Sequence, residues 1–225
     1  MPSAVLFPLD WHSIDHVVLD FGGVLYEIDH HRTADAFAQL GLNDFYLEFR
    51  HGNQAEVFDR LERGEISEEA FLDQMARRCH PGTTVEQVRS AWNALLMGLR
   101  PEALPWVHSL VRHFDVLLFS NTNAIHAAHF EQDILNSKGR SFGDSFRQII
   151  YSHRLGQRKP EVHTFEQVAR EFNLQPERTV LIDDTKANVA GAIAAGWQGV
   201  YFDIEAFNFT QFIRGVGYDD FLSGT

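Results

Sequence analysis

Five short apolar segments, separated by stretches long enough for helices, constrain the fold of this 225-residue chain more than any other feature. They lie near residues 16–19, 116–119, 148–151, 179–182 and 200–202. Short runs of β-branched and aliphatic residues are typical of strands buried on both faces. Strands that alternate with helices form a parallel sheet with right-handed crossovers. The sequence therefore predicts an α/β fold with a Rossmann-like, doubly wound parallel sheet.

The stretch from about residue 30 to residue 100 has a different pattern. Its apolar residues recur at helical spacing, as at Phe71, Leu72 and Met75, and residues 84–87 have the form of a capping box. We expect an all-helical cap subdomain there, without strands, inserted into an α/β core made of residues 1–29 and 101–225. Residues 26–29 alternate apolar and acidic side chains, which is consistent with a small hairpin arm. Residues 206–225 have no pattern that assigns an element.

Composition and charge exclude several classes of function. The formal net charge of −12 disfavours a nucleic-acid surface, because phosphate backbones are bound by basic side chains. Cys79 is the one cysteine, so no intrachain disulfide forms, and low cysteine use is typical of cytoplasmic proteins. We find no secretion signal before Trp11 and no apolar run near the roughly 20 residues of a membrane span. We expect a cytoplasmic monomer or homodimer.

Polar side chains follow the predicted strands on their carboxyl side. In a doubly wound sheet those ends converge on one crevice. Carboxylates gathered there repel unless a cation lies among them, and hard oxygen ligands suit Mg²⁺. A hydroxyl, an amide and a lysine suit a phosphoryl group, and a carboxylate can act as the nucleophile. The residues are Asp20, Ser120, Asn121, Lys159, Asp183 and Asp184. A helix is expected directly after Lys159, with Pro160 in its first turn.

Four segments resemble, in order, the four motifs of the haloacid dehalogenase superfamily. They are Leu-Asp-Phe-Gly-Gly-Val-Leu at 19–25, Phe-Ser-Asn-Thr-Asn at 119–123, Arg-Lys-Pro-Glu at 158–161 and Leu-Ile-Asp-Asp-Thr at 181–185. The resemblance spans the α/β part, and the helical insertion lies where that family has its first type of cap. With Leu-Arg-Pro-Glu at 99–102, the chain is similar to bacterial sugar-phosphate phosphatases, notably those for α-glucose-1-phosphate.

This resemblance implies a Mg²⁺-dependent phosphomonoester hydrolase that acts on a small phosphorylated metabolite through an aspartyl-phosphate. Asp20 would be the nucleophile and a metal ligand. Gly22 would offer its backbone carbonyl to the metal, Asp184 would be a direct ligand, and Asp183 would bind directly or through water. The phosphoryl oxygens would be held by Ser120 and Asn121. Lys159 would neutralise charge on Asp20 and on the phosphoryl group.

One position departs from the family pattern. Most phosphatases of the superfamily have a second aspartate two residues after the nucleophile, as general acid and base, and here that residue is Gly22. Glu27 and Asp29 are candidate substitutes, although a solvated hairpin face is the simpler interpretation. A missing acid matters least when the leaving group is good, as an anomeric hydroxyl is.

Two other functions remain open at this stage. Dehalogenases of the same fold also lack the second aspartate, but they use no metal, and the pair Asp183–Asp184 would be costly without a cation. A non-catalytic protein that has lost its acid is the other alternative. The pairs His126/His129 and His30/His31 have a spacing that allows metal binding, but scattered surface histidines explain them better. No role is assigned to Arg32, Arg50 or His51 in the cap.

Overall fold

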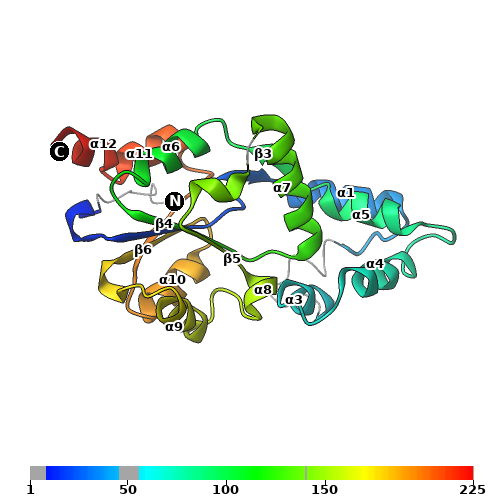
Figure 1. Ribbon diagram of the computed structural model, residues 1–225. Helices are drawn as coiled ribbons and strands as arrows, with labels where there is room; N and C mark the ends of the chain where they lie inside the picture. Colours follow the sequence, from blue (N-terminus) through cyan, green and yellow to red (C-terminus); the bar gives the residue numbers. More distant parts are fainter. Residues whose placement is uncertain (1–8, 46–55, 140, 225) are drawn as a thin grey trace.

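The computed structural model describes residues 9–45, 56–139 and 141–224. Its centre is a five-stranded, all-parallel sheet (Figure 1). The strands, in spatial order, are β5 (Gln148–Tyr151), β4 (Asp115–Ser120), β1 (His16–Leu19), β6 (Thr179–Asp183) and β7 (Gln198–Tyr201). Leu19 at the end of β1 lies between Leu118 of β4 and Ile182 of β6. The predicted doubly wound fold is confirmed.

Helices cover both faces of the sheet, as the alternation of side chains along buried strands requires. Val17 and Leu19 pack on one face against a large cluster that includes Phe130 and Phe212. That face is covered by α6 (Ala103–Leu110), α7 (Ala124–Lys138), α11 (Phe209–Gly215) and α12 (Tyr218–Gly224). Val18 packs on the other face with Phe165 and Trp197, under α9 (Val162–Glu171) and α10 (Lys186–Ala194). Shorter helices are η1 (Trp11–Ser13), η2 (Phe142–Ser145), α8 (Ser152–Leu155) and η3 (Pro176–Arg178).

A group of helices with its own core lies beside the sheet, at the right in Figure 1. It consists of α1 (His30–Gln39), α3 (Glu56–Glu62), α4 (Glu68–Ala76) and α5 (Val85–Asn93). Its core is aromatic: the Phe37 and Phe45 rings stack at 4.3 Å, and the Phe58 and Trp92 rings stack at 5.5 Å. Aromatic pairs of this kind add stability beyond the area that they bury. The predicted capping box at Thr84 is formed.

The expectation of no strands between residues 30 and 100 is wrong at the end of the helical segment. Leu96–Leu99 forms strand β3, which pairs antiparallel with β2 (Tyr26–Ile28). Residues 26–29 therefore form no hairpin of their own. The leucines at 96 and 99 have helical spacing, but Gly98 lies between them with φ +129°, a value that helices do not use. Residues 46–55 of this segment, which include Arg50 and His51, lie outside the described residues.

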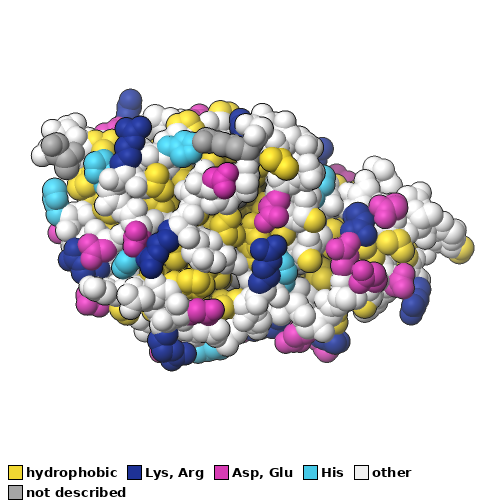
Figure 2. Space-filling view, viewed as in Figure 1, with side chains coloured by type: hydrophobic (Ala, Val, Ile, Leu, Met, Phe, Trp, Pro, Cys, Tyr) yellow, Lys and Arg dark blue, Asp and Glu magenta, His cyan; other side chains and the backbone are white. Residues whose placement is uncertain are grey.

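Two further elements differ from expectation. Pro160 is not in the first turn of a helix, because α9 begins at Val162 after the N-cap Glu161, and the Lys159–Pro160 peptide is cis. The unassigned residues after 206 include α11 and α12; α11 opens with a capping box at Asn208 and buries Phe209 and Phe212. None of the described helices has the length and apolarity to cross a membrane. On the face shown in Figure 2, basic and acidic side chains are interspersed, without one basic patch.

Candidate active site

The order of the strands brings Asp20 and Asp183 together. Asp20 follows β1, and its backbone N–H donates to the carbonyl of Ile182 over 2.9 Å. Asp183 ends the neighbouring strand β6. β1 and β6 are adjacent at the centre of the sheet. The next core strand after β1 is β4, on one side of this pair, and the next after β6 is β7, on the opposite side. This is the switch point where α/β sheets bind ligands.

Lys159 joins these two carboxylates. Its Nζ donates to Asp20 Oδ1 over 2.8 Å, to Asp183 Oδ2 over 2.6 Å and to the carbonyl of Phe119 over 2.8 Å. The side chain is fully buried. Burial opposes its charge, but the two carboxylates outweigh that effect and raise the pKa of Lys159. All three ammonium protons therefore have acceptors, and the group stays cationic.

Asn121 holds the backbone of Lys159 in place. The Asn121 side chain donates to the Lys159 carbonyl over 2.8 Å and accepts from the Lys159 N–H over 3.0 Å. The sequence assigned this side chain to phosphoryl oxygens; in the structure its amide positions the lysine. Ser120, at the end of β4, is buried, and its hydroxyl makes no hydrogen bond within the described part of the chain. Of the two, Ser120 has the hydroxyl that is available to a ligand.

Asp183 and Asp184 have different surroundings. Asp183 is completely buried, and its two oxygens accept hydrogen bonds from Lys159, the Thr185 N–H and the Asn188 amide. Asp184 is part-exposed, with a long contact of 3.4 Å from the Thr185 hydroxyl. Asp183 therefore acts as a fixed structural anion, whereas Asp184 can offer its oxygens to a ligand.

The carboxylates of Asp20, Asp183 and Asp184 each place an oxygen within 4.8 Å of the others. Burial, and then repulsion among the three groups, raises the pKa of Asp20 to about 8 against the pull of Lys159. Burial and Asp183 likewise raise the pKa of Asp184 to about 6. One ammonium does not balance three carboxylates, and a divalent cation would. Oxygen donors in this arrangement fit Mg²⁺.

Gly22 is two residues after Asp20, and the Ile28 side chain occupies the space next to its Cα. A Cβ built on Gly22 would fall 3.2 Å from Ile28 Cδ1. The two candidate substitutes for the missing acid have structural partners. Glu27 accepts from Arg100 over 3.0 Å, and Asp29 caps α1 by accepting from the His31 N–H over 2.9 Å. Neither contact aims a carboxylate at Asp20.

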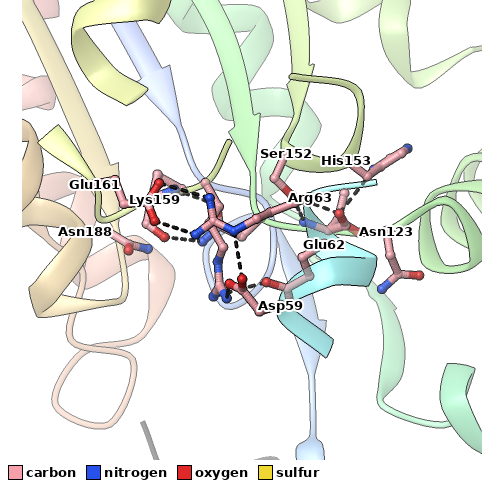
Figure 3. Close-up of polar contacts among 12 residues, drawn as sticks. Asp59, Glu62, Arg63, Asn123, Ser152, His153, Lys159, Glu161 and Asn188 are labelled. Carbon is pink, nitrogen blue, oxygen red and sulfur yellow. Dashed lines mark hydrogen bonds and ion pairs between the residues drawn. The ribbon is translucent and has the colours of Figure 1, made fainter. Parts of the chain in front are cut away.

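Several functional contacts were missed from the sequence. His126 is not on the surface: it is buried, stacks on Trp92 at 4.7 Å and contacts Asn123. The motif residue Arg158 forms ion pairs with Asp59 and Glu62 of α3. Glu161 pairs with Arg63, the residue directly after α3, and Figure 3 shows these two side chains together. These partners are many residues apart in the chain, and single polar residues leave no periodic signal. Two of the contacts are local: Asn188 with Asp183, five residues apart, and Asn123 with His126, three residues apart.

Comparison with known proteins is consistent with this geometry. Residues 14–196 match the model of a family of hydrolases described as haloacid dehalogenase-like hydrolase. The chain is 28% identical over 176 residues to a D-ribitol-5-phosphate phosphatase of Bacteroides thetaiotaomicron, covering 78% of this chain and 85% of that protein. It is 27% identical over 187 residues to the sesquiterpene phosphatase astK of Aspergillus oryzae, covering 82% of this chain and 87% of that protein.

A solved structure has the same architecture. It is an aspartate-to-alanine variant of the HAD family enzyme bt-2542 from Bacteroides thetaiotaomicron, in complex with magnesium and inorganic phosphate. The TM-score is 0.79 at 25% sequence identity, and the match covers 83% of this chain and 93% of that one.

Proposed function

The chain belongs to the haloacid dehalogenase-like hydrolase family, and from that premise we propose that it is a Mg²⁺-dependent phosphatase of small phosphorylated metabolites. The observation that carries the proposal is the buried Lys159 ammonium between Asp20 and Asp183, with Asp184 within 4.8 Å of both carboxylates. A nucleophile, a fixed cation and an open oxygen ligand are thereby gathered at one strand edge. Phosphoryl transfer needs a well-positioned nucleophile and stabilisation of the charge on the phosphoryl oxygens.

Asp20 is the nucleophile in this proposal. Its carboxylate attacks phosphorus, the bond from phosphorus to the leaving oxygen breaks, and an aspartyl-phosphate forms. The leaving oxygen takes a proton from solvent. Water then attacks that phosphorus and gives up its proton to solvent, the bond from phosphorus to the Asp20 oxygen breaks, inorganic phosphate leaves, and the Asp20 carboxylate is restored. Lys159 stabilises the negative charge on Asp20 and on the phosphoryl oxygens, and the Ser120 hydroxyl donates to one of them.

Asp20, Asp184 and the backbone carbonyl of Gly22 would hold Mg²⁺, which adds positive charge at the phosphoryl group. Asp183 contributes through water and through Lys159, since its own oxygens are already occupied by Lys159, Thr185 and Asn188. The fit rests on the donor set: three carboxylates around one ammonium leave net negative charge for a cation. The same excess of charge argues against a metal-free dehalogenase site.

The helical segment from residue 30 to residue 100 is proposed as a cap over this site, which selects the substrate. We propose a sugar phosphate or sugar-alcohol phosphate, supported by the relative named D-ribitol-5-phosphate phosphatase. Since Gly22 cannot protonate a leaving group, esters with good leaving groups, such as anomeric phosphates, are favoured. A panel of sugar phosphates distinguishes these substrates.

The test is phosphate release from an aryl phosphate, in Mg²⁺ and in EDTA. The wild-type protein should be active with Mg²⁺ only, and Asp20→Asn should be inactive although folded. Asp144→Asn, which changes an exposed carboxylate in η2, is the matched control and should keep full activity. An active Asp20→Asn variant would remove the proposed nucleophile. Chloride release from a 2-haloacid without metal would favour a dehalogenase instead.

A further inference from the structure

The loop that carries Lys159 is held by helix α3 of the helical segment. Figure 3 shows Asp59 and Glu62 of α3, and Arg63 directly after the helix, directed at this loop. Arg158 donates to Asp59 over 2.9 Å and pairs with Glu62 over 3.1 Å. Arg63 pairs with Glu161. On the loop, Arg158 is one residue before Lys159 and Glu161 is two residues after it.

The geometry of these ion pairs is specific. The two terminal nitrogens of Arg63 contact the two oxygens of Glu161, one of them over 3.1 Å, which is the bidentate arrangement. Arg63 Nε also donates to Asp59 Oδ2 over 2.8 Å, four residues earlier on α3. The side chains of Arg63 and Arg158 are 18% and 19% exposed. Linked, part-buried pairs of this kind are worth more than isolated surface pairs.

The inner side of the same loop is fixed to the α/β core. Asn121 holds the backbone of Lys159, and the Thr164 hydroxyl donates to the Arg158 carbonyl over 3.1 Å. Helix α10 approaches the loop so closely that a Cβ on Gly191 would fall 2.2 Å from the Pro160 carbonyl oxygen. The inner side of the loop is thus fixed to the α/β core, whereas its outer side is held by the ion pairs with Asp59, Glu62 and Arg63.

A second contact between the helical segment and the core is of a different kind. Trp92 of α5 stacks on the buried His126 of α7, and its Nε1 donates to Asn123 over 3.3 Å. That contact is buried and combines ring stacking with hydrogen bonds between uncharged groups, whereas the α3 contact includes ion pairs that are part-exposed. The ionic contact is therefore the one that salt and single charge changes can loosen.

We propose that Arg63 and Glu161 are positioning residues, which couple the placement of α3 to the placement of Lys159 in the active site. The proposal rests on the proposed function for its kinetic part. The ion pairs fix the outer side of the loop, so that the Lys159 ammonium is held where negative charge develops during phosphoryl transfer. Misplacement of such a group lowers transition-state stabilisation rather than substrate affinity.

The kinetic test compares Arg63→Met, Arg63→Lys and Glu161→Gln. We expect Arg63→Met to lower kcat about 3- to 10-fold with KM changed less than about twofold, the scale of a part-buried ion-pair network. Arg63→Lys keeps the charge without the bidentate contact and should recover part of kcat. The double variant with Glu161→Gln should be no worse than the worse single variant, because both remove one interaction. An unchanged kcat in Arg63→Met, or a change in KM alone, would overturn the proposal.

Arg89 provides the matched control. It pairs with Glu68, and both lie within the helical segment, so Arg89→Met removes an ion pair of similar exposure that does not reach the loop. Its kcat should equal that of wild type. High salt should lower the kcat of wild type and Arg89→Met toward that of Arg63→Met, which should itself change little.

Hydrogen exchange gives a readout that does not need activity. In Arg63→Met the backbone amides of Arg158, Lys159 and Glu161 should exchange at least about threefold faster than in wild type and Arg89→Met, because opening of the loop costs less. Unchanged exchange would overturn the coupling even in an active enzyme. If no phosphate ester is hydrolysed by wild type, the proposed function fails, while the exchange result still decides whether Arg63 holds the loop.

Discussion

A Cβ built on Gly23 would fall 1.9 Å from Oδ2 of Asp184. The backbone after Asp20, the proposed nucleophile, and the carboxylate of Asp184 after β6 are thus in direct contact, with no room for a side chain between them. Gly23 also has φ +81°, a conformation that L residues rarely adopt. The second glycine of the first motif therefore sets the position of Asp184, a group proposed to bind the metal.

Gly23→Ala should displace Asp184 and weaken Mg²⁺ binding at least about tenfold, as loss of a supporting contact at a metal site does. Isothermal titration calorimetry with Mg²⁺ measures this. Gly82→Ala is the matched control, because Gly82 has φ +89° and no atom within 4 Å of its Cβ position. Both variants should lose about 1–3 kcal/mol of stability from backbone strain, but only Gly23→Ala should lose Mg²⁺ affinity. Equal Mg²⁺ affinities would show that Asp184 is not displaced or not a ligand.

The stability of the metal-free protein should fall as pH rises toward 8. The pKa of Asp20 is raised from 3.8 to about 8, mainly by burial, so the folded state keeps a proton that the unfolded state has released. Each such proton lowers the free energy of unfolding by up to about 1.4 kcal/mol per pH unit. Above pH 6.5, Asp184 with a pKa of about 6 contributes little more. Denaturant unfolding in EDTA measures the slope.

Mg²⁺ should reverse that trend, because it binds the deprotonated carboxylates. The stabilisation by saturating Mg²⁺, measured in the same unfolding experiment, should therefore grow between pH 6 and pH 8. NaCl at matched ionic strength controls for screening by salt. A stabilisation that is the same at every pH would mean that Asp20 and Asp184 are already ionised without metal.

The rate of hydrolysis should depend steeply on the leaving group. Without an acid at position 22, aryl phosphates should react about 10²–10⁴-fold faster than alkyl phosphates, which is the usual contribution of acid catalysis. Gly22→Asp combined with Ile28→Ala, which removes the side chain 3.2 Å from the new Cβ, should narrow that gap. Ile28→Ala alone is the control. If the wild-type rate did not change with the pKa of the leaving group, another group would already be protonating the leaving oxygen.

His126 should stay neutral in the folded protein down to strongly acidic pH. Burial lowers its pKa to about 3. Its Nε2 is 3.1 Å from the Trp92 carbonyl, which only accepts, so Nε2 carries the proton and Nδ1 accepts from the Asn123 amide. ¹⁵N NMR of the imidazole should show the Nε2–H tautomer from pH 8 to pH 4. A titration near 6.5 would contradict the buried position.

The central strands β1, β4 and β6 were predictable because they are almost wholly buried, and continuous burial leaves an apolar run in the sequence. The edge strands β5 and β7 are only part-buried, but each keeps a short apolar run. Asp20, Lys159, Asp183 and Asp184 were predictable for a related reason. Parallel strands bring their carboxyl ends to one edge of the sheet, so a polar residue that follows a predicted strand is expected at that edge.

The rest depends on contacts between residues far apart in the chain. β3 was hidden because Leu96 and Leu99 fit a helical period, and only pairing with β2 distinguishes the two structures. The Asn121 side chain holds the backbone of Lys159, 38 residues later, and nothing local in the sequence reveals that contact. Its expected contact with phosphoryl oxygens stays a prediction. Arg63 and Glu161 are 98 residues apart, and single charged residues carry no periodicity that would match them.

The β2–β3 ribbon also bears on how such proteins diversify. The chain leaves the core through Tyr26 and returns at its partner Leu99, and the Asp29 N–H donates to the Leu95 carbonyl over 2.9 Å. The two ends of the intervening segment are therefore neighbours, as they are at sites where whole domains can be inserted. Evolution, or an engineer, can exchange everything between these two strands for another module without altering the order of the sheet. A new substrate range would then come with one recombination event rather than with many point substitutions.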